Sequence, residues 1–84
     1  MRKIEREAVQ AFKEGRNYKK SNTEVRVVGS DIYVFLHGNL IVWKSGLTGS
    51  TTYSHCGWHT PTTASRLRAF GANAHIVNGE LIIK

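Results

Sequence analysis

The stretch from Tyr53 to Phe70 constrains the fold most, because it contains the only proline of the chain and the clearest helix start. Thr60 can cap a helix with its hydroxyl group, and Pro61 suits the first helical position. Apolar residues then recur on one face of the predicted helix: Ala64, Leu67 and Phe70. The sequence therefore predicts a short helix here, preceded by a turn rich in aromatic and polar side chains.

An amphipathic helix is predicted for residues 2–14, where apolar side chains recur near the helical period. Three strands are expected after it: residues 23–28, 32–36 and 40–43. The last two flank Gly38-Asn39, a dipeptide suited to a tight hairpin loop because both residues tolerate positive φ. With that loop Val34 pairs with Trp43, which places Trp43 in the core. Both faces of the hairpin are apolar enough to be covered.

The C-terminal third predicts one further hairpin. Residues 47–54 form a fourth strand or stay irregular, and residues 74–77 and 80–84 flank Asn78-Gly79, the strongest two-residue hairpin signal of the chain. Strands grouped between helices indicate an α+β fold with a small, mostly antiparallel sheet: helix, three or four strands, helix, C-terminal hairpin. At 84 residues the chain is expected to form one compact domain, 1–84.

The charge is strongly positive, with twelve Lys and Arg against six Asp and Glu. Such a field attracts nucleic acid, anionic lipid or acidic protein surfaces. A core of this size leaves little room for a deep catalytic pocket, which favours a binding module over an enzyme. The single Cys forms no intramolecular disulfide, the N-terminus lacks the apolar run of a signal peptide, and no stretch suits a membrane span. We therefore expect a soluble, cytoplasmic protein with no membrane partner.

Cations interleaved with aromatic residues are the candidate binding groups. Three cations surround Tyr18 in residues 16–22, which are expected to form a polar loop, and Trp58 with His59 offers stacking surfaces near two arginines. Threonines at the predicted helix start either cap the helix or form an anion site. Packing in the core is favoured for Trp58 over an exposed platform. The candidate set is Arg16, Tyr18, Lys19, Lys20, Trp58, His59, Thr60, Thr62, Thr63, Arg66 and Arg68.

Metal and nucleophile chemistry has weaker candidates in His55, Cys56 and His59. Zinc sites need four N or S ligands, and this segment offers three, so packed or hydrogen-bonded roles are favoured over a metal site. Adjacent residues on a strand point to opposite faces, which places His55 badly to activate Cys56. Neither a cofactor nor a catalytic residue is predicted.

The residues LHGNLIVW (36–43) and SHCGWHTPTTASRLRAF (54–70) resemble a group of small uncharacterised proteins of tailed bacteriophages. The shared pattern is an L-H-G-N hairpin followed by a G-W-x-T-x-T-T…R-L segment, and the resemblance covers the chain from about Ala8 onward. It implies action in the cytoplasm of an infected bacterium and supplies no catalytic residues.

The leading hypothesis is a non-enzymatic phage-type accessory protein that binds nucleic acid through a basic face. The alternative is an inhibitor that binds a host protein or defence complex, and a weaker alternative is a metal-dependent nuclease or hydrolase. Open strand edges also permit a homodimer.

Overall fold

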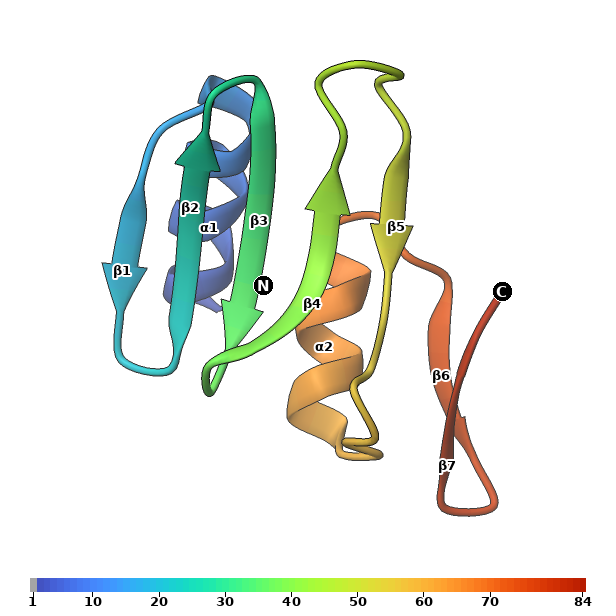
Figure 1. Ribbon diagram of the computed structural model, residues 1–84. Helices are drawn as coiled ribbons and strands as arrows, with labels where there is room; N and C mark the ends of the chain where they lie inside the picture. Colours follow the sequence, from blue (N-terminus) through green and yellow to red (C-terminus); the bar gives the residue numbers. More distant parts are fainter. Residues whose placement is uncertain (1) are drawn as a thin grey trace.

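The computed structural model describes residues 2–84 (Figure 1). Two helices and seven strands follow one another as α1 (Lys3–Glu14), β1 (Tyr18–Lys20), β2 (Thr23–Val28), β3 (Asp31–Leu36), β4 (Asn39–Lys44), β5 (Thr51–Tyr53), α2 (Pro61–Ala69), β6 (Ala74–Val77) and β7 (Glu80–Ile83). The first five strands form an antiparallel sheet in chain order, and β6 and β7 form a separate two-stranded sheet. The predicted α+β class is confirmed.

Both predicted helices are present, because their local end signals act as the sequence indicates. Gly15 adopts a left-handed conformation (φ 68°) and ends α1. At α2 the Thr60 hydroxyl accepts a hydrogen bond from the Thr63 backbone N–H (3.2 Å), and Pro61 occupies the first turn. Both helices lie on the same side of the five-stranded sheet (Figure 1), so only one sheet face is packed against them.

The β3–β4 hairpin differs from the prediction by one residue in its loop. His37 and Gly38, not Gly38 and Asn39, form the two-residue loop, and both have positive φ (52° and 79°), as a type I′ turn requires. The register then shifts between Val34 and Phe35, because Ile41 is an extra residue on β4. The predicted pairing of Val34 with Trp43 is wrong; Val34 pairs with Val42.

This bulge decides which side chains of β4 are buried. Ile41 and Val42 are both buried although they are consecutive, and Trp43 is left 40% exposed on the opposite face. A change of register by one residue moves every later side chain to the other face of a sheet. The expectation that Trp43 lies in the core, and that both hairpin faces are covered, is therefore corrected: within residues 2–84, no helix packs on the outer face.

Two further segments form strands where the sequence predicted a loop or left the structure open. Residues 18–20, expected within a polar loop, form β1 and pair with β2 at the edge of the sheet. Residues 51–53 form β5, so the fourth-strand alternative for residues 47–54 holds in part. Asn78-Gly79 is the loop of the second hairpin, as predicted, and its β6 strand packs next to α2.

The core lies between the sheet and the helices and contains one buried ion pair. Its apolar part includes Ala8 and Ala11 of α1, the inner face of the sheet, and Leu67 of α2. Arg66 of α2 donates to the carboxylate of Glu5 of α1 (Nη1 to Oε2, 2.7 Å), and both side chains are almost fully buried. The pair thus joins the two helices inside the core.

Candidate nucleic-acid interface

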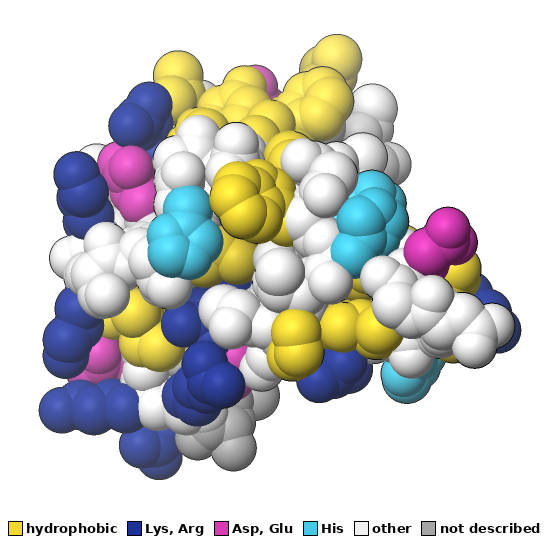
Figure 2. Space-filling model, turned by 90° about the horizontal axis from the view of Figure 1, so that it is seen from below, with side chains coloured by type: hydrophobic (Ala, Val, Ile, Leu, Met, Phe, Trp, Pro, Cys, Tyr) yellow, Lys and Arg dark blue, Asp and Glu magenta, His cyan; other side chains and the backbone are white. Residues whose placement is uncertain are grey.

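The exposed positive charge is concentrated on the side of the molecule formed by α1, β1 and β2. Residues 1–30 contain eight of the twelve Lys and Arg and four of the six acidic residues. Because Glu5 is buried with Arg66, only three of those four carboxylates face solvent. Figure 2 shows Lys and Arg side chains gathered along one side of the molecule. We call the side formed by α1, β1 and β2 the basic side.

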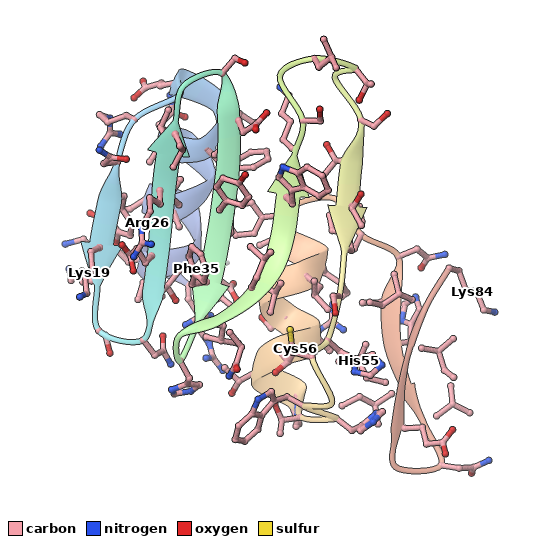
Figure 3. The ribbon with its side chains drawn as sticks, viewed as in Figure 1. Lys19, Arg26, Phe35, His55, Cys56 and Lys84 are labelled. Carbon is pink, nitrogen blue, oxygen red and sulfur yellow. The ribbon has the colours of Figure 1, made fainter. Side chains whose placement is uncertain are left out.

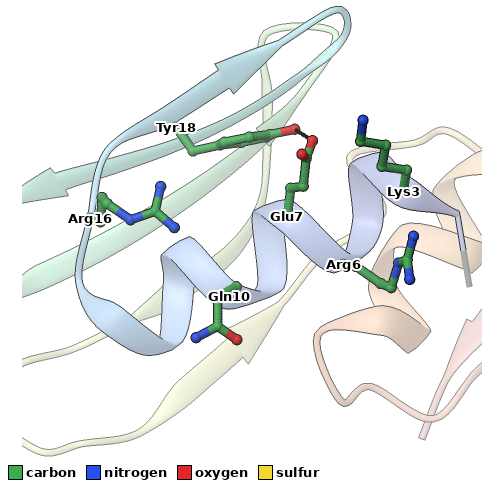
Figure 4. Close-up of a pocket in the computed structure, with 6 residues that line it drawn as sticks. All are labelled: Lys3, Arg6, Glu7, Gln10, Arg16 and Tyr18. Atoms are coloured by element: carbon green, nitrogen blue, oxygen red, sulfur yellow. Dashed lines mark hydrogen bonds between the residues drawn. The ribbon is translucent and has the colours of Figure 1, made fainter.

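A groove between α1 and β1 lies on the basic side (Figure 4). It has a volume of about 410 Å³ and is lined by Lys3, Arg6, Glu7, Gln10, Arg16 and Tyr18. In the described part of the chain neither Lys3 nor Arg6 forms an ion pair, whereas Arg16 pairs with Glu14 (2.9 Å). The groove therefore offers two cations without a close ion pair, of which Lys3 lies near Glu7, beside a third that is paired with Glu14.

Glu7 is the only carboxylate in the lining, and it is already hydrogen-bonded. The Tyr18 hydroxyl donates to Glu7 Oε1 (2.9 Å), and Lys20 Nζ lies 3.7 Å from the same oxygen. The Tyr18 hydrogen bond holds the pKa of Glu7 below its ordinary value, and burial together with Glu7 raises the pKa of Tyr18. Tyr18 is thus a wall of the groove whose hydroxyl is engaged, rather than a free stacking ring.

Of the residues predicted for a binding face, two are buried. Arg66 is 3% exposed, and its guanidinium donates to Glu5 and to the Thr23 hydroxyl (Nε to Oγ1, 3.1 Å). Thr63 is 2% exposed, and its hydroxyl is hydrogen-bonded to the Thr60 hydroxyl (3.0 Å). Neither side chain can reach a ligand at the surface, which corrects the assignment of Arg66 to the basic face and of Thr63 to the binding residues. Of the two alternatives for the threonines at the helix start, capping fits Thr60 and Thr63.

The other predicted residues belong to two parts of the chain. Arg16, Tyr18, Lys19 and Lys20 belong to the basic side. Trp58, His59, Thr60 and Thr62 lie in or next to the turn before α2. Trp58 is 49% exposed, so the expectation that it packs in the core is corrected. Arg68 is exposed and donates to the Ala74 carbonyl (3.0 Å), which ties α2 to β6. The structure therefore brings together the N-terminal candidates on the basic side. The Trp58 ring lies beside His37 (centroids 6.4 Å apart), and His37 lines a pocket together with Lys19.

The two histidines of the turn before α2 face each other, with ring centroids 4.5 Å apart. Each Nδ1 accepts a backbone hydrogen bond: His55 from Gly57 (2.9 Å) and His59 from Leu81 (2.8 Å). Cys56 Sγ donates to the Leu40 carbonyl (2.7 Å). Within residues 2–84, no three His, Cys, Asp or Glu side chains are grouped as a metal site requires. These groups thus stabilise the turn, and His59 ties it to β7.

Sequence reasoning missed the outer face of the sheet, which carries three aromatic rings. Tyr33 and Trp43 are cross-strand partners with parallel rings (centroids 6.2 Å apart, 4° between planes), and Phe35 is 6.5 Å from Tyr33. The Arg26 guanidinium lies 5.0 Å from the Phe35 ring centroid (Figure 3). The alternation of Tyr33 and Phe35 with buried residues was a signal of this face, but only the structure shows that it is open.

The fold and charge distribution define a small basic α+β protein whose surface features are suited to binding. The described helices include none long and apolar enough to cross a membrane. Residues 1–84 match the family model described as Kyanoviridae Gp96 protein, and the chain belongs to this family of phage proteins. The expected phage origin is thereby supported, whereas the expectation that the family shares the L-H-G-N and G-W-x-T-x-T-T…R-L motifs stays a prediction. No curated protein and no solved structure matches the chain.

Proposed function

We propose that this phage protein is a non-enzymatic accessory protein that binds nucleic acid through its basic side, in the cytoplasm of the infected bacterium. The observation that carries the proposal is the concentration of eight cations against three solvent-facing carboxylates in residues 1–30, together with the groove that Lys3, Arg6 and Arg16 help to line. A phosphate backbone is the polyanion that such a surface attracts, and each neutralised phosphate adds to the salt dependence of binding. Lys3 and Arg6 are the first phosphate contacts.

The test is fluorescence anisotropy of labelled single- and double-stranded oligonucleotides titrated with the protein at about 50 and about 200 mM salt. Lys3→Glu is compared with Lys84→Glu, because the two substitutions change the net charge equally at opposite ends of the chain. We expect Lys3→Glu to weaken binding and to lower the salt slope by roughly one, and Lys84→Glu to leave the slope unchanged. Equal effects of the two variants, or binding insensitive to salt, would refute the proposal.

A host protein is the second candidate partner, because apolar side chains are exposed on the C-terminal hairpin. Ile76, Val77 and Ile82 lie on β6 and β7 and are each at least one third exposed. Val77 and Ile82 share one face of this hairpin, and such a pair suits the apolar centre of a protein interface. A partner retained from bacterial lysate by the wild type and lost with Val77→Asp, but still retained by Lys3→Glu, would support this role. Retention by both variants would exclude this surface.

A homodimer and a metal-dependent nuclease or hydrolase remain lesser proposals with direct tests. Sedimentation of the purified protein over a range of concentrations measures the oligomeric state, and a single monomer mass would exclude the dimer. Incubation with DNA and RNA in the presence of divalent cations tests cleavage, and intact substrates would exclude nuclease activity.

A further inference from the structure

We propose that the outer face of the sheet is a stacking surface for the bases of single-stranded nucleic acid. The inference rests on the proposed function and deepens it, because it names the form of nucleic acid and the residues that contact it. The face is defined by Tyr33, Phe35 and Trp43, and by Arg26 beside them. It is a different surface from the α1–β1 groove that holds the phosphate contacts.

The three rings are arranged as a base-stacking surface requires. Tyr33 and Phe35 alternate along β3 on the outer face, and Trp43 extends the row onto β4, with its ring parallel to that of Tyr33. Trp43 is 40% exposed, so the row is not fully enclosed by its neighbours. Bases of unpaired strands stack on aromatic side chains of sheets in this manner, whereas the bases of a duplex are stacked on one another and present only their edges.

Arg26 gives this aromatic row a cation. Its guanidinium lies against the Phe35 ring, and Glu24 of the same strand orients it through hydrogen bonds from Nε (3.3 Å) and Nη2 (3.1 Å). A guanidinium plane stacks on bases as well as on side-chain rings. Glu24 offsets much of the charge of Arg26, so the face supplies stacking while the neighbouring basic side supplies most of the electrostatic attraction.

The outer face continues into the basic side through β1. Lys19 pairs with Glu24 in the β1–β2 register and lies on the outer face, and the following residue, Lys20, approaches Glu7 at the groove. Figure 3 shows Lys19, Arg26 and Phe35 in sequence across β1, β2 and β3. A strand whose bases stack on the rings can therefore pass its phosphates to Lys19 and Lys20 at the sheet edge. This continuity selects nucleic acid over a protein as the occupant of the aromatic face.

The experiment uses Trp43 as its own reporter. In the full chain with Trp58→Phe, Trp43 is the only tryptophan. Its emission is recorded during titration with a single-stranded oligonucleotide, with a duplex of the same sequence, and with an abasic oligonucleotide of equal length. We expect quenching by the single strand, and none by the abasic strand, which has the phosphates but no bases.

Affinities of two alanine variants complete the test. We expect Trp43→Ala to weaken single-strand binding about 5- to 150-fold with an unchanged salt slope. Trp58→Ala is the comparison variant, because Trp58 is exposed to a similar degree but stands in the turn before α2, against His37 and outside the row of rings on β3 and β4, and it should leave the affinity unchanged. Tyr33→Leu keeps an apolar group on the sheet and should weaken binding without unfolding the protein.

Each other outcome overturns the inference in a recognisable way. Salt-sensitive binding of single strand, duplex and abasic strand with equal affinity, without quenching of Trp43, would leave the proposed function standing and remove the stacking surface. Loss of affinity in Trp58→Ala but not in Trp43→Ala would place stacking at the turn before α2. Failure to bind any of the three probes at low salt would overturn both proposals.

Discussion

Replacing Arg66 by methionine should be among the most destabilising single substitutions in this protein. The side chain is 3% exposed and makes two charge-assisted hydrogen bonds, to Glu5 and to Thr23. Each such bond contributes about 1.5–3 kcal/mol, and removing one partner of a buried ion pair costs about 3–5 kcal/mol because the other charge is left without compensation. We therefore expect Arg66→Met to lower the free energy of unfolding by about 3–5 kcal/mol.

That loss is large compared with the whole stability of the domain, which for 84 residues is roughly 4–13 kcal/mol. Urea denaturation followed by circular dichroism measures it, and Arg68→Met is the matched control two positions along the same helix. Arg68 is exposed and makes a single hydrogen bond to a carbonyl, so this control should cost about 1 kcal/mol. Equal midpoints for the two variants would refute the view that Arg66 acts in the core.

Three further outcomes follow from the packing. Burial would raise the pKa of Glu5, but hydrogen bonds from Ser65 and Arg66 outweigh it and hold the pKa below its ordinary value of 4.5. The ionised Glu5 carboxylate therefore contributes to the stability of the fold above pH 4.5, and this contribution is lost as the pH falls through the folded-state pKa. Glu5→Gln should flatten this acid limb in denaturation curves taken at a series of pH values; an unchanged limb would contradict the assignment. Leu67 is fully buried and Leu47 is 93% exposed, so Leu67→Ala should cost about 2–5 kcal/mol and Leu47→Ala less than about 0.5 kcal/mol by urea denaturation. The Tyr53 hydroxyl donates to the Phe70 carbonyl at the end of α2 (2.9 Å). Tyr53→Phe should therefore lower the thermal midpoint by an amount equivalent to about 0.5–1.5 kcal/mol of unfolding free energy. An unchanged midpoint would show that this hydrogen bond makes no net contribution to stability.

The helices and the second hairpin could be predicted from the sequence because their signals are local. Thr60 and Pro61 lie within one turn of the groups they affect, and Gly15 ends α1 at its own position. Asn78-Gly79 likewise determines its own loop, where both residues adopt positive φ. Such signals depend on the backbone conformation of a few neighbouring residues, which the sequence determines directly.

The β3–β4 hairpin could not be predicted in the same way, because two arrangements of its loop satisfy the local rules. Gly38 tolerates positive φ with either neighbour, and the choice of His37 over Asn39 moves the pairing by two residues, so that Leu36 pairs with Asn39 and not with Ile41. The bulge at Ile41 reverses one residue of that shift, and Ile41 and Val42 both reach the core. Packing across the whole sheet decides between the two loop positions, and the exposure of Trp43 depends on which one forms.

The two kinds of cation in this chain explain why composition alone misplaces the candidate binding residues. Arg66 compensates a buried carboxylate that lies 61 residues earlier, whereas Lys3 and Arg6 remain at the surface without an ion pair among the described residues. Composition counts Arg66, Lys3 and Arg6 as three equal positive charges. Loss of nucleic-acid binding in an Arg66 variant would therefore report an unfolded protein as readily as a lost contact. Lys3→Glu and Trp43→Ala change surface groups only, so a loss of binding in these variants measures the interface itself.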